Sequence, residues 1–504
     1  MKFRFGYHDH LSSRYADVVY DTDILNNGHM LLCGMSGSGK TWMLNQMLNS
    51  FALTAPRTDD FRIHVFDVHG DIRADSRFES SLLFSEQTDY GLNPFRVDPD
   101  PHTGGVRKRV QGVLNILNRT SRDLGEQQEA VFRNLAYDTY RIYGFDPKNP
   151  STWFIDEHSE EVRLSDGDQD RFYLDVPIGE KDEVKELGGR WDAQARSWYI
   201  TEAMYQGALT KWPPKLMQRR HPSLQDMIRV ARHVAQKSFL GINNNAMQKL
   251  FDLHRAAGAL RKRKMETYRS LNGRSQDTLF ADEREKLHKA QEKAIDAFSA
   301  YAKADLSGHE LDDMMRYDNY NTLSSTLVRL ENLDAIGIFK TRRPPFEPAK
   351  SVWRYDLTKL DKDEATMFTL FRLEELLEEC MKKGECKHVR CVVLLDEAKR
   401  YAAGGKGENI LDRIANEARK FGMVMILSSQ APYHFTQDSI GSMATKVLLR
   451  IDESYWGDAC KKMQLTRDEL ASVKPKMNFL VQMKGDNMLG EWKRVRFGHP
   501  VGRT

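Results

Sequence analysis

The stretch Gly34-Met35-Ser36-Gly37-Ser38-Gly39-Lys40-Thr41 decides the fold predicted for this 504-residue chain. It fits the phosphate-loop pattern G-x-x-x-x-G-K-[ST], in which glycines let backbone N–H groups point toward a bound phosphate chain. The loop follows a short apolar stretch at residues 29–33 and precedes helical periodicity at residues 40–51. A second apolar stretch, residues 62–67, completes a strand–helix–strand unit, which implies a parallel sheet with right-handed crossovers. The sequence therefore predicts an α/β fold around a nucleotide site.

The phosphate loop gives the first group of candidate residues. The Lys40 ammonium would reach the β- and γ-phosphates, and the Thr41 hydroxyl would bind Mg2+. The N-terminus of the following helix adds a dipole that favours bound phosphate. We therefore expect ATP and Mg2+ as ligands, with Lys40 also acting in catalysis. The residues predicted to bind the nucleotide are Gly34, Ser36, Gly37, Ser38, Gly39, Lys40, Thr41 and Trp42.

A second motif, Val392-Val393-Leu394-Leu395-Asp396-Glu397, has the form of a Walker B strand, because an apolar run ends in two carboxylates. Asp396 would hold Mg2+ through water, and Glu397 would orient and polarise the attacking water. The alternative is a buried strand that happens to end in surface acids. Beside a phosphate loop, the pair predicts hydrolysis rather than binding alone.

Two further candidates flank the next apolar strand, residues 424–428. Gln430 follows this strand at the carboxyl edge of the sheet, where ligands of open α/β sheets bind, so it would sense the γ-phosphate or orient the water. Arg419 precedes the strand at a helix end. It is a candidate arginine finger, because a planar cation stabilises charge on a transferred phosphoryl group. A solvated arginine on a charged helix is the alternative.

The sheet pattern is interrupted by a long, charged and mostly helical segment. We predict an ATPase core in two parts, residues 1–105 and 351–504, separated by an insertion at residues 106–350. Within the insertion, residues 171–202 read as a small strand–helix–strand module. Residues 245–305 are rich in Ala, Lys, Arg, Glu and Leu, which favours long helices. Strands resume at residues 391–396, 424–428 and 446–450, before a hairpin of residues 479–483 with 492–497.

The composition is that of a soluble globular protein. Hydrophobic residues make up 40% and charged residues 29% of the chain, and no apolar run is long enough to span a membrane. Five scattered cysteines and the lack of a visible signal peptide predict reduced thiols in the cytoplasm. The net charge of +3 is too small to imply nucleic-acid binding by itself, so a DNA-binding surface would need local clustering.

The insertion offers two candidate surfaces for nucleic acid. The run Arg261-Lys262-Arg263-Lys264, with Arg255 nearby, would present charge suited to phosphate backbones; the alternative is a solvated helix face. In the module, Trp191, Trp198 and Tyr199 would stack on single-stranded bases or form the core. We favour core packing, because so small a module needs its aromatic residues inside.

The motifs, taken in order, resemble the HerA/FtsK superfamily of ring ATPases. The order runs from the phosphate loop through Asp67-Val68-His69-Gly70-Asp71, Leu92-Asn93-Pro94-Phe95, Asp396-Glu397, Arg419-Lys420-Phe421-Gly422 and Ser429-Gln430. The match is similar to the HerA branch and to motor domains of type IV secretion and conjugation ATPases. The 171–202 module resembles a small domain of unknown function that is fused to plasmid primases.

This resemblance implies a RecA-like (ASCE) core and a hexameric ring with nucleotide at the subunit interfaces, where Arg419 would act on a neighbour's ATP. Asp67 and His69 follow a strand at its carboxyl edge, so they would flank the nucleotide or the interface. A structural turn around Gly70 is the alternative.

Our leading functional prediction is an ATP-hydrolysing DNA translocase or helicase of a mobile element or defence system. One alternative is an ATPase that energises a type IV secretion or conjugation machine through protein partners. The mobile-element-like module favours that alternative, and a phosphate loop as early as residue 34 disfavours it. Another is an ATP-gated, DNA-binding assembly scaffold, which the acidic pair disfavours. Expected partners are further copies in a homo-hexamer, DNA, and an effector or secretion protein, in the cytoplasm and without a membrane span.

Overall fold

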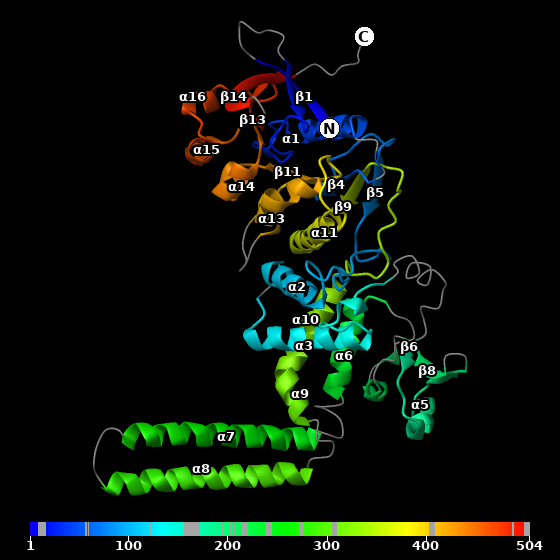
Figure 1. Ribbon diagram of the computed structural model, residues 1–504, viewed down its shortest axis with the longest axis vertical. Coiled ribbons are helices and arrows are strands. Elements are labelled where there is room, and N and C mark those ends of the chain that lie inside the picture. Colours follow the sequence, from blue (N-terminus) through cyan, green and yellow to red (C-terminus); the bar gives the residue numbers. More distant parts are fainter. Residues whose placement is uncertain are drawn as a thin grey trace. The chain divides into compact units, whose positions relative to one another are not determined.

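The chain folds, in a computed structural model, into two compact units (Figure 1). The structure describes residues 1–8, 17–55, 58, 60–120, 123–155, 172–193, 196–201, 204–205, 207–212, 220–236, 244–271, 277–304, 310–402, 409–485 and 488–497. The first unit comprises Met1–Pro94, Gln111–Asp123 and Ile336–Thr504. The second comprises Phe95–Val110 and Leu124–Ala335.

The first unit is built on one large sheet, which joins eleven of the described strands in the order β2-β1-β14-β13-β12-β3-β11-β10-β4-β9-β5. All pairs from β12 to β5 are parallel, and those from β2 to β12 are antiparallel. The expected α/β fold with a mostly parallel sheet is therefore confirmed. The strands are β1 Lys2–His8, β2 Asp17–Asp21, β3 Met30–Cys33, β4 Arg62–Asp67, β5 Glu79–Leu83, β9 Val352–Asp356, β10 Cys391–Leu395, β11 Met423–Ser429, β12 Thr445–Leu448, β13 Asn478–Gly485 and β14 Met488–Phe497.

The central strands are short apolar runs buried on both faces, as parallel strands covered by helices must be. Helix α1 (Lys40–Leu53) packs Leu44 and Met47 into the same core as Val392 and Leu394, alternate residues of β10. The other described α-helices that lie wholly within this unit are α11 Lys362–Lys382, α12 Lys399–Ala402, α13 Ile410–Glu417, α14 Gln437–Ser442, α15 Trp456–Met463 and α16 Arg467–Ala471. Three 3-10 turns accompany them in the described residues: η6 Ala418–Phe421, η7 Pro432–His434 and η8 Glu453–Tyr455.

The second unit contains a bundle of helices. Its buried Asp226 accepts hydrogen bonds from Tyr143, Arg220 and Arg229, which ties the start of α6 to the end of α3. The bundle helices are α3 Glu126–Ile142, α6 Leu224–Val234, α9 Glu310–Tyr317 and α10 Tyr320–Ala335. Two long helices, α7 Asn244–Leu271 and α8 Asp277–Ala304, lie side by side as an antiparallel hairpin (Figure 1).

The boundaries between the units differ from the predicted 105/106 and 350/351. Helix α2 (Val106–Thr120) belongs to the first unit from Gln111 onward, where Asn115 and Arg119 line a cavity with Glu374 of α11. The segment after Ala335 also belongs to the first unit, because Leu92 exchanges backbone hydrogen bonds with Ile338 and Lys340. Hydrogen bonding and packing between segments far apart in sequence set these boundaries, and composition did not reveal them.

The small module has three described strands rather than the two expected. They are β6 Phe172–Leu174, β7 Arg190–Asp192 and β8 Ser197–Ile200, in the antiparallel order β6-β8-β7, with helix α5 Lys181–Glu186. The core consists of Leu174, Val184, Ile200, Tyr205, Leu209 and Trp212. Trp198 packs against this core as expected, but Trp191 is 52% exposed and contacts Trp198 edge to face.

The remaining short turns are η1 Pro150–Thr152, η2 Ile178–Glu180 and η4 Gly207–Lys211. Among the described helices, none combines the length and the apolar character that crossing a membrane requires.

Candidate nucleotide site

The phosphate loop joins β3 to α1, and its backbone is fixed at both neighbouring strands. The Gly34 N–H donates to the Ser429 carbonyl at the end of β11 (3.0 Å), and the Met35 N–H donates to the Arg450 carbonyl beyond β12 (2.7 Å). Gly37 and Gly39 have φ of 76° and 104°, a region that side chains disfavour. A Cβ on Gly34 would lie 2.5 Å from the Ser38 hydroxyl oxygen, so the loop needs glycine here for close packing as well.

Lys40 and Thr41 begin α1 at this loop. The Lys40 ammonium donates to the carbonyls of Gly34 (2.7 Å) and Met35 (3.1 Å), and burial lowers its pKa. The Thr41 hydroxyl donates to the Asp71 carboxylate at 3.2 Å. Both side chains therefore lie at the mouth of the loop.

The acidic pair follows β10 at the same sheet edge. Asp396 is buried, and this burial raises the pKa of its carboxyl group. Glu397 has φ of 49°, a left-handed conformation that is uncommon for a residue with a side chain. A backbone held in such a sparsely populated region is frequent at functional sites.

Four side chains of the described residues lie around the Glu397 carboxylate. The Gln430 amide donates to it at 3.3 Å, and the His69 Nε2 atom lies 3.6 Å from it. Lys399 and Arg400 lie 3.7 and 3.6 Å away. Partial burial opposes the charged form, but the two cations outweigh burial and lower the pKa of Glu397. Glu397 is thus an ionised carboxylate at neutral pH, as a proton acceptor must be.

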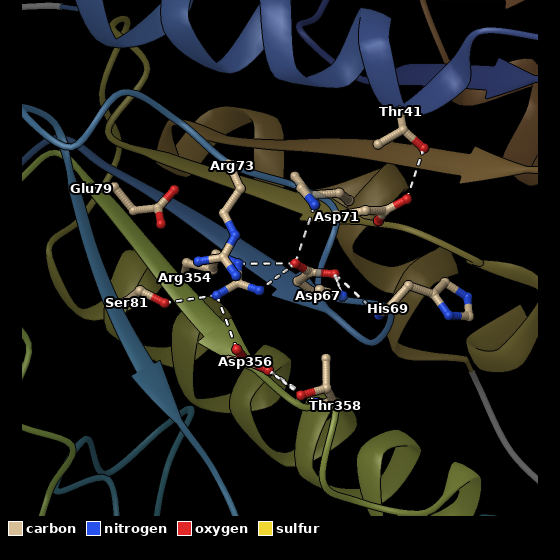
Figure 2. A network of polar contacts seen from close by, with 12 residues as sticks. Thr41, Asp67, His69, Asp71, Arg73, Glu79, Ser81, Arg354, Asp356 and Thr358 are labelled. Carbon is tan, nitrogen blue, oxygen red and sulfur yellow. Dashed lines mark hydrogen bonds and ion pairs between the residues drawn. The ribbon is translucent and has the colours of Figure 1, made fainter.

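Asp67 lies beneath this site rather than in it. Its carboxylate accepts the backbone N–H groups of His69, Gly70 and Ile72 and forms a fully buried ion pair with Arg354 of β9, 2.6 Å long (Figure 2). This arrangement matches the structural-turn alternative for Asp67. His69, by contrast, lies beside Glu397.

The loop after β4 is also attached to α1. The Asn45 side chain accepts the Arg73 N–H (3.0 Å) and donates to the Asp71 carbonyl (3.2 Å), and Asn49 accepts the Asp75 N–H (2.7 Å). These contacts bring the Asp71 carboxylate to Thr41 (Figure 2). Asp71 belongs to the motif that begins at Asp67, but the sequence did not predict it as a site residue. Residue spacing does not show that this loop folds back onto α1.

Arg419 lies at the amino ends of the parallel strands, opposite the ends that carry the phosphate loop. Arg419 precedes the first residue of β11, and the phosphate loop lies level with the last residue of β11. Seven strand residues therefore separate Arg419 from the loop by about 20 Å. Its charge adds to the burial that lowers the pKa of His29, at the start of β3, to about 4. Within one chain, Arg419 is therefore remote from Lys40 and Glu397.

The candidate nucleic-acid residues lie in the second unit. Arg255, Arg261, Lys262, Arg263 and Lys264 are all exposed along α7, which both the nucleic-acid and the solvated-face interpretations require. Arg263 forms an exposed ion pair with Glu266 (2.9 Å).

The residues at the loop fit a triphosphate with Mg2+. A Cβ added at Gly37 would meet no atom within 4 Å, so the loop faces open space at this position. The buried Ser38 hydroxyl has no hydrogen-bond partner among the described residues. Thr41 and Asp396 supply the oxygen ligands that Mg2+ prefers. The fold resembles that of RecA-like P-loop proteins, and the loop with the acidic pair forms a site that fits a nucleotide.

Comparisons with known proteins agree with this class. The chain is 30% identical over 139 residues to the DNA double-strand break repair helicase HerA of Pyrococcus furiosus. This stretch covers 26% of this chain and 23% of that protein. The solved structure of VirB4 of Thermoanaerobacter pseudethanolicus matches 99% of this chain and 96% of its own, with a TM-score of 0.53 and 11% identity, a likeness of fold. The expected resemblance to HerA/FtsK-like P-loop ATPases is confirmed.

The module has its own relatives. Residues 171–214 match the model of a domain of unknown function, DUF5710. The chain is also 51% identical over 43 residues to the DNA primase TraC of Escherichia coli, covering 8% of this chain and 4% of the primase. These two matches confirm the resemblance predicted for the module. The chain thus spans less than a quarter of the length of either curated relative.

Proposed function

We propose that this protein is an ATP-hydrolysing ring motor of the HerA/FtsK type that translocates or unwinds DNA in the cytoplasm. The observation that carries the proposal is the arrangement around Glu397. An ionised carboxylate, oriented by Gln430 and His69, lies beside Asp396 at the sheet edge where Lys40 and Thr41 begin α1. A protein that only bound nucleotide would not need a positioned proton acceptor.

Each residue then has a defined task in hydrolysis. Lys40 would move from the loop carbonyls to the β- and γ-phosphates, and Glu397 would accept a proton from the attacking water while Gln430 keeps that water in line. Thr41 and Asp396 would hold Mg2+, which neutralises phosphate charge when bound. The positive φ of Gly37 and Gly39 lets the loop follow the phosphate chain.

The position of Arg419 supports a ring. About 20 Å from its own phosphate loop, this arginine can act on ATP only in a neighbouring subunit. We therefore propose a homo-hexamer in which Arg419 reaches the nucleotide bound by the next copy. Closed rings of this kind arise when one surface of a subunit binds a different surface of its neighbour.

DNA is the substrate that we propose for this motor. The exposed basic residues of α7 offer contacts to phosphate groups without reading base sequence. The similarity to a protein named as a DNA repair helicase points the same way.

The test is ATP turnover measured with double-stranded DNA, with single-stranded DNA and without DNA, across a salt series. We expect DNA to stimulate turnover several-fold and the stimulation to fall as salt rises, because phosphate contacts release counterions. A Lys40→Ala variant controls for contaminating ATPases. Turnover in the wild type that DNA leaves unchanged at every salt concentration would contradict DNA as the substrate. That result would favour a motor acting on protein partners, as in secretion or conjugation.

A further inference from the structure

An exposed aromatic pair borders the phosphate loop. Trp42, the third residue of α1, is 45% exposed, and its ring meets the Phe497 ring at the end of β14 edge to face, with centroids 5.3 Å apart and planes at 79°. Exposure of so large an apolar side chain at the mouth of a site is informative, because tryptophan is highly buried on average.

Phe497 is held in place from beneath. Its ring packs against Phe479 of β13 with centroids 4.7 Å apart, and its strand pairs with β1 at Gly6. The outer part of the ring borders the loop, since a Cβ added at Gly39 would lie 3.9 Å from the Phe497 Cζ atom. Trp42 and the loop therefore have a fixed aromatic neighbour that does not depend on bound nucleotide.

Trp42 has no role in the core of its own helix. The buried residues of α1 are Met43, Leu44, Met47, Leu48 and Phe51. Trp42 follows Thr41 directly, so its side chain leaves the helix within one residue of the hydroxyl assigned to Mg2+. The Trp42 ring, 45% exposed at that position, leaves apolar surface that a flat ligand can contact.

We propose that Trp42 and Phe497 form the base-binding platform of the nucleotide site, in which the adenine of ATP stacks on the Trp42 ring and is bordered by the Phe497 ring at 79° to it. This inference rests on the nucleotide site proposed above. Lys40 and Thr41 would hold the terminal phosphates of ATP. The nucleoside end of the ATP molecule would then extend past the first turn of α1. Aromatic rings bind bases through their flat faces, and stacking contributes enough for one ring to change affinity about tenfold.

The test compares a ligand that has a base with one that has none. Binding of ATP and of inorganic tripolyphosphate, both with Mg2+, is measured by calorimetry for the wild type, Trp42→Ala, Phe497→Ala and Trp42→Phe. We expect Trp42→Ala and Phe497→Ala each to weaken ATP binding about tenfold and to leave tripolyphosphate binding within twofold. Trp42→Phe, which keeps an aromatic ring, is expected to retain most of the affinity for ATP.

The matched control is Phe298→Ala, which removes a 59% exposed aromatic ring from helix α8 of the other unit. It should bind both ligands as the wild type does. Unchanged ATP affinity in Trp42→Ala would overturn the platform, and so would equal weakening of ATP and tripolyphosphate. A wild-type protein that binds neither ligand would instead refute the proposed function itself.

Discussion

At the scale of single residues, the site depends on how one loop is folded. Asp67 collects three backbone N–H groups and pairs with the buried Arg354, so the chain turns sharply after β4. His69 and Asp71 then lie beside different parts of the site, with His69 near Glu397 and Asp71 bonded to Thr41. One buried ion pair thus supports contacts to both nucleotide motifs.

The first prediction concerns Asp71. Because its carboxylate bonds to the hydroxyl assigned to Mg2+, Asp71→Asn removes a negative charge next to the cation. We expect the Mg2+ concentration that supports half-maximal ATP binding to rise several-fold, with little change in nucleotide binding when Mg2+ is absent. Mg2+ titrations followed by calorimetry measure both quantities.

The control for Asp71 is Asp75→Asn, which lies in the same loop but pairs with the exposed Arg77. The loss of this surface pair should leave the Mg2+ requirement unchanged. An Asp71→Asn protein whose Mg2+ requirement equals that of the wild type would show that Asp71 serves only the loop.

At the scale of elements, the antiparallel part of the sheet contains a buried charge. Lys446 of β12 is 5% exposed and donates to Gln482 of β13 at 2.9 Å. Burial, together with the charge of Lys484, lowers the pKa of Lys446 to about 8. The folded state therefore releases this proton at a lower pH than the unfolded chain does.

The second prediction follows from the sign of this shift. Between pH 8 and the ordinary lysine value near 10.5, the unfolded state binds more protons, so Lys446 makes the free energy of unfolding rise with pH. Below pH 8 this group costs the fold up to about 3 kcal/mol. Denaturant unfolding at pH 7.5 and pH 10 should show a smaller rise in Lys446→Met than in the wild type. Equal changes in both proteins would contradict the shift.

Sequence reasoning located the elements around the site because each has a strong local signal. The run from Gly34 to Thr41 is recognisable by its glycines. In β10 and β11, an apolar run ends where polar residues begin, and this change marks the carboxyl end of each strand. Lys399 and Arg400 beside Glu397, and Asp71 beside Thr41, could not be found in this way. Asn45 and Asp71 meet across 26 residues of sequence, and that contact is a product of tertiary packing.

At the scale of the whole molecule, the place of Arg419 in the fold bears on the expectation that it acts on a neighbour's ATP. The sequence placed it next to a catalytic strand, but the direction of β11 puts it at the edge away from its own phosphate loop. In the proposed ring, an arginine in that position would contribute to hydrolysis only through a second copy of the chain.

The third prediction tests this division of labour. Arg419→Ala should bind ATP normally and lose turnover by about a thousandfold, as removal of an arginine finger does. Mixed with Glu397→Gln, it should regain part of the activity, because some interfaces then combine an intact Glu397 with an intact Arg419. Mixtures that stay as inactive as either variant alone would contradict a shared site.

We propose above all that this protein hydrolyses ATP with Glu397 as the proton acceptor. The most direct measurement is steady-state ATP turnover and ATP affinity in Glu397→Gln, compared with the wild type. We expect turnover to fall at least about a hundredfold while ATP still binds, because the amide cannot accept the proton. Turnover at the wild-type rate in Glu397→Gln would contradict the claim.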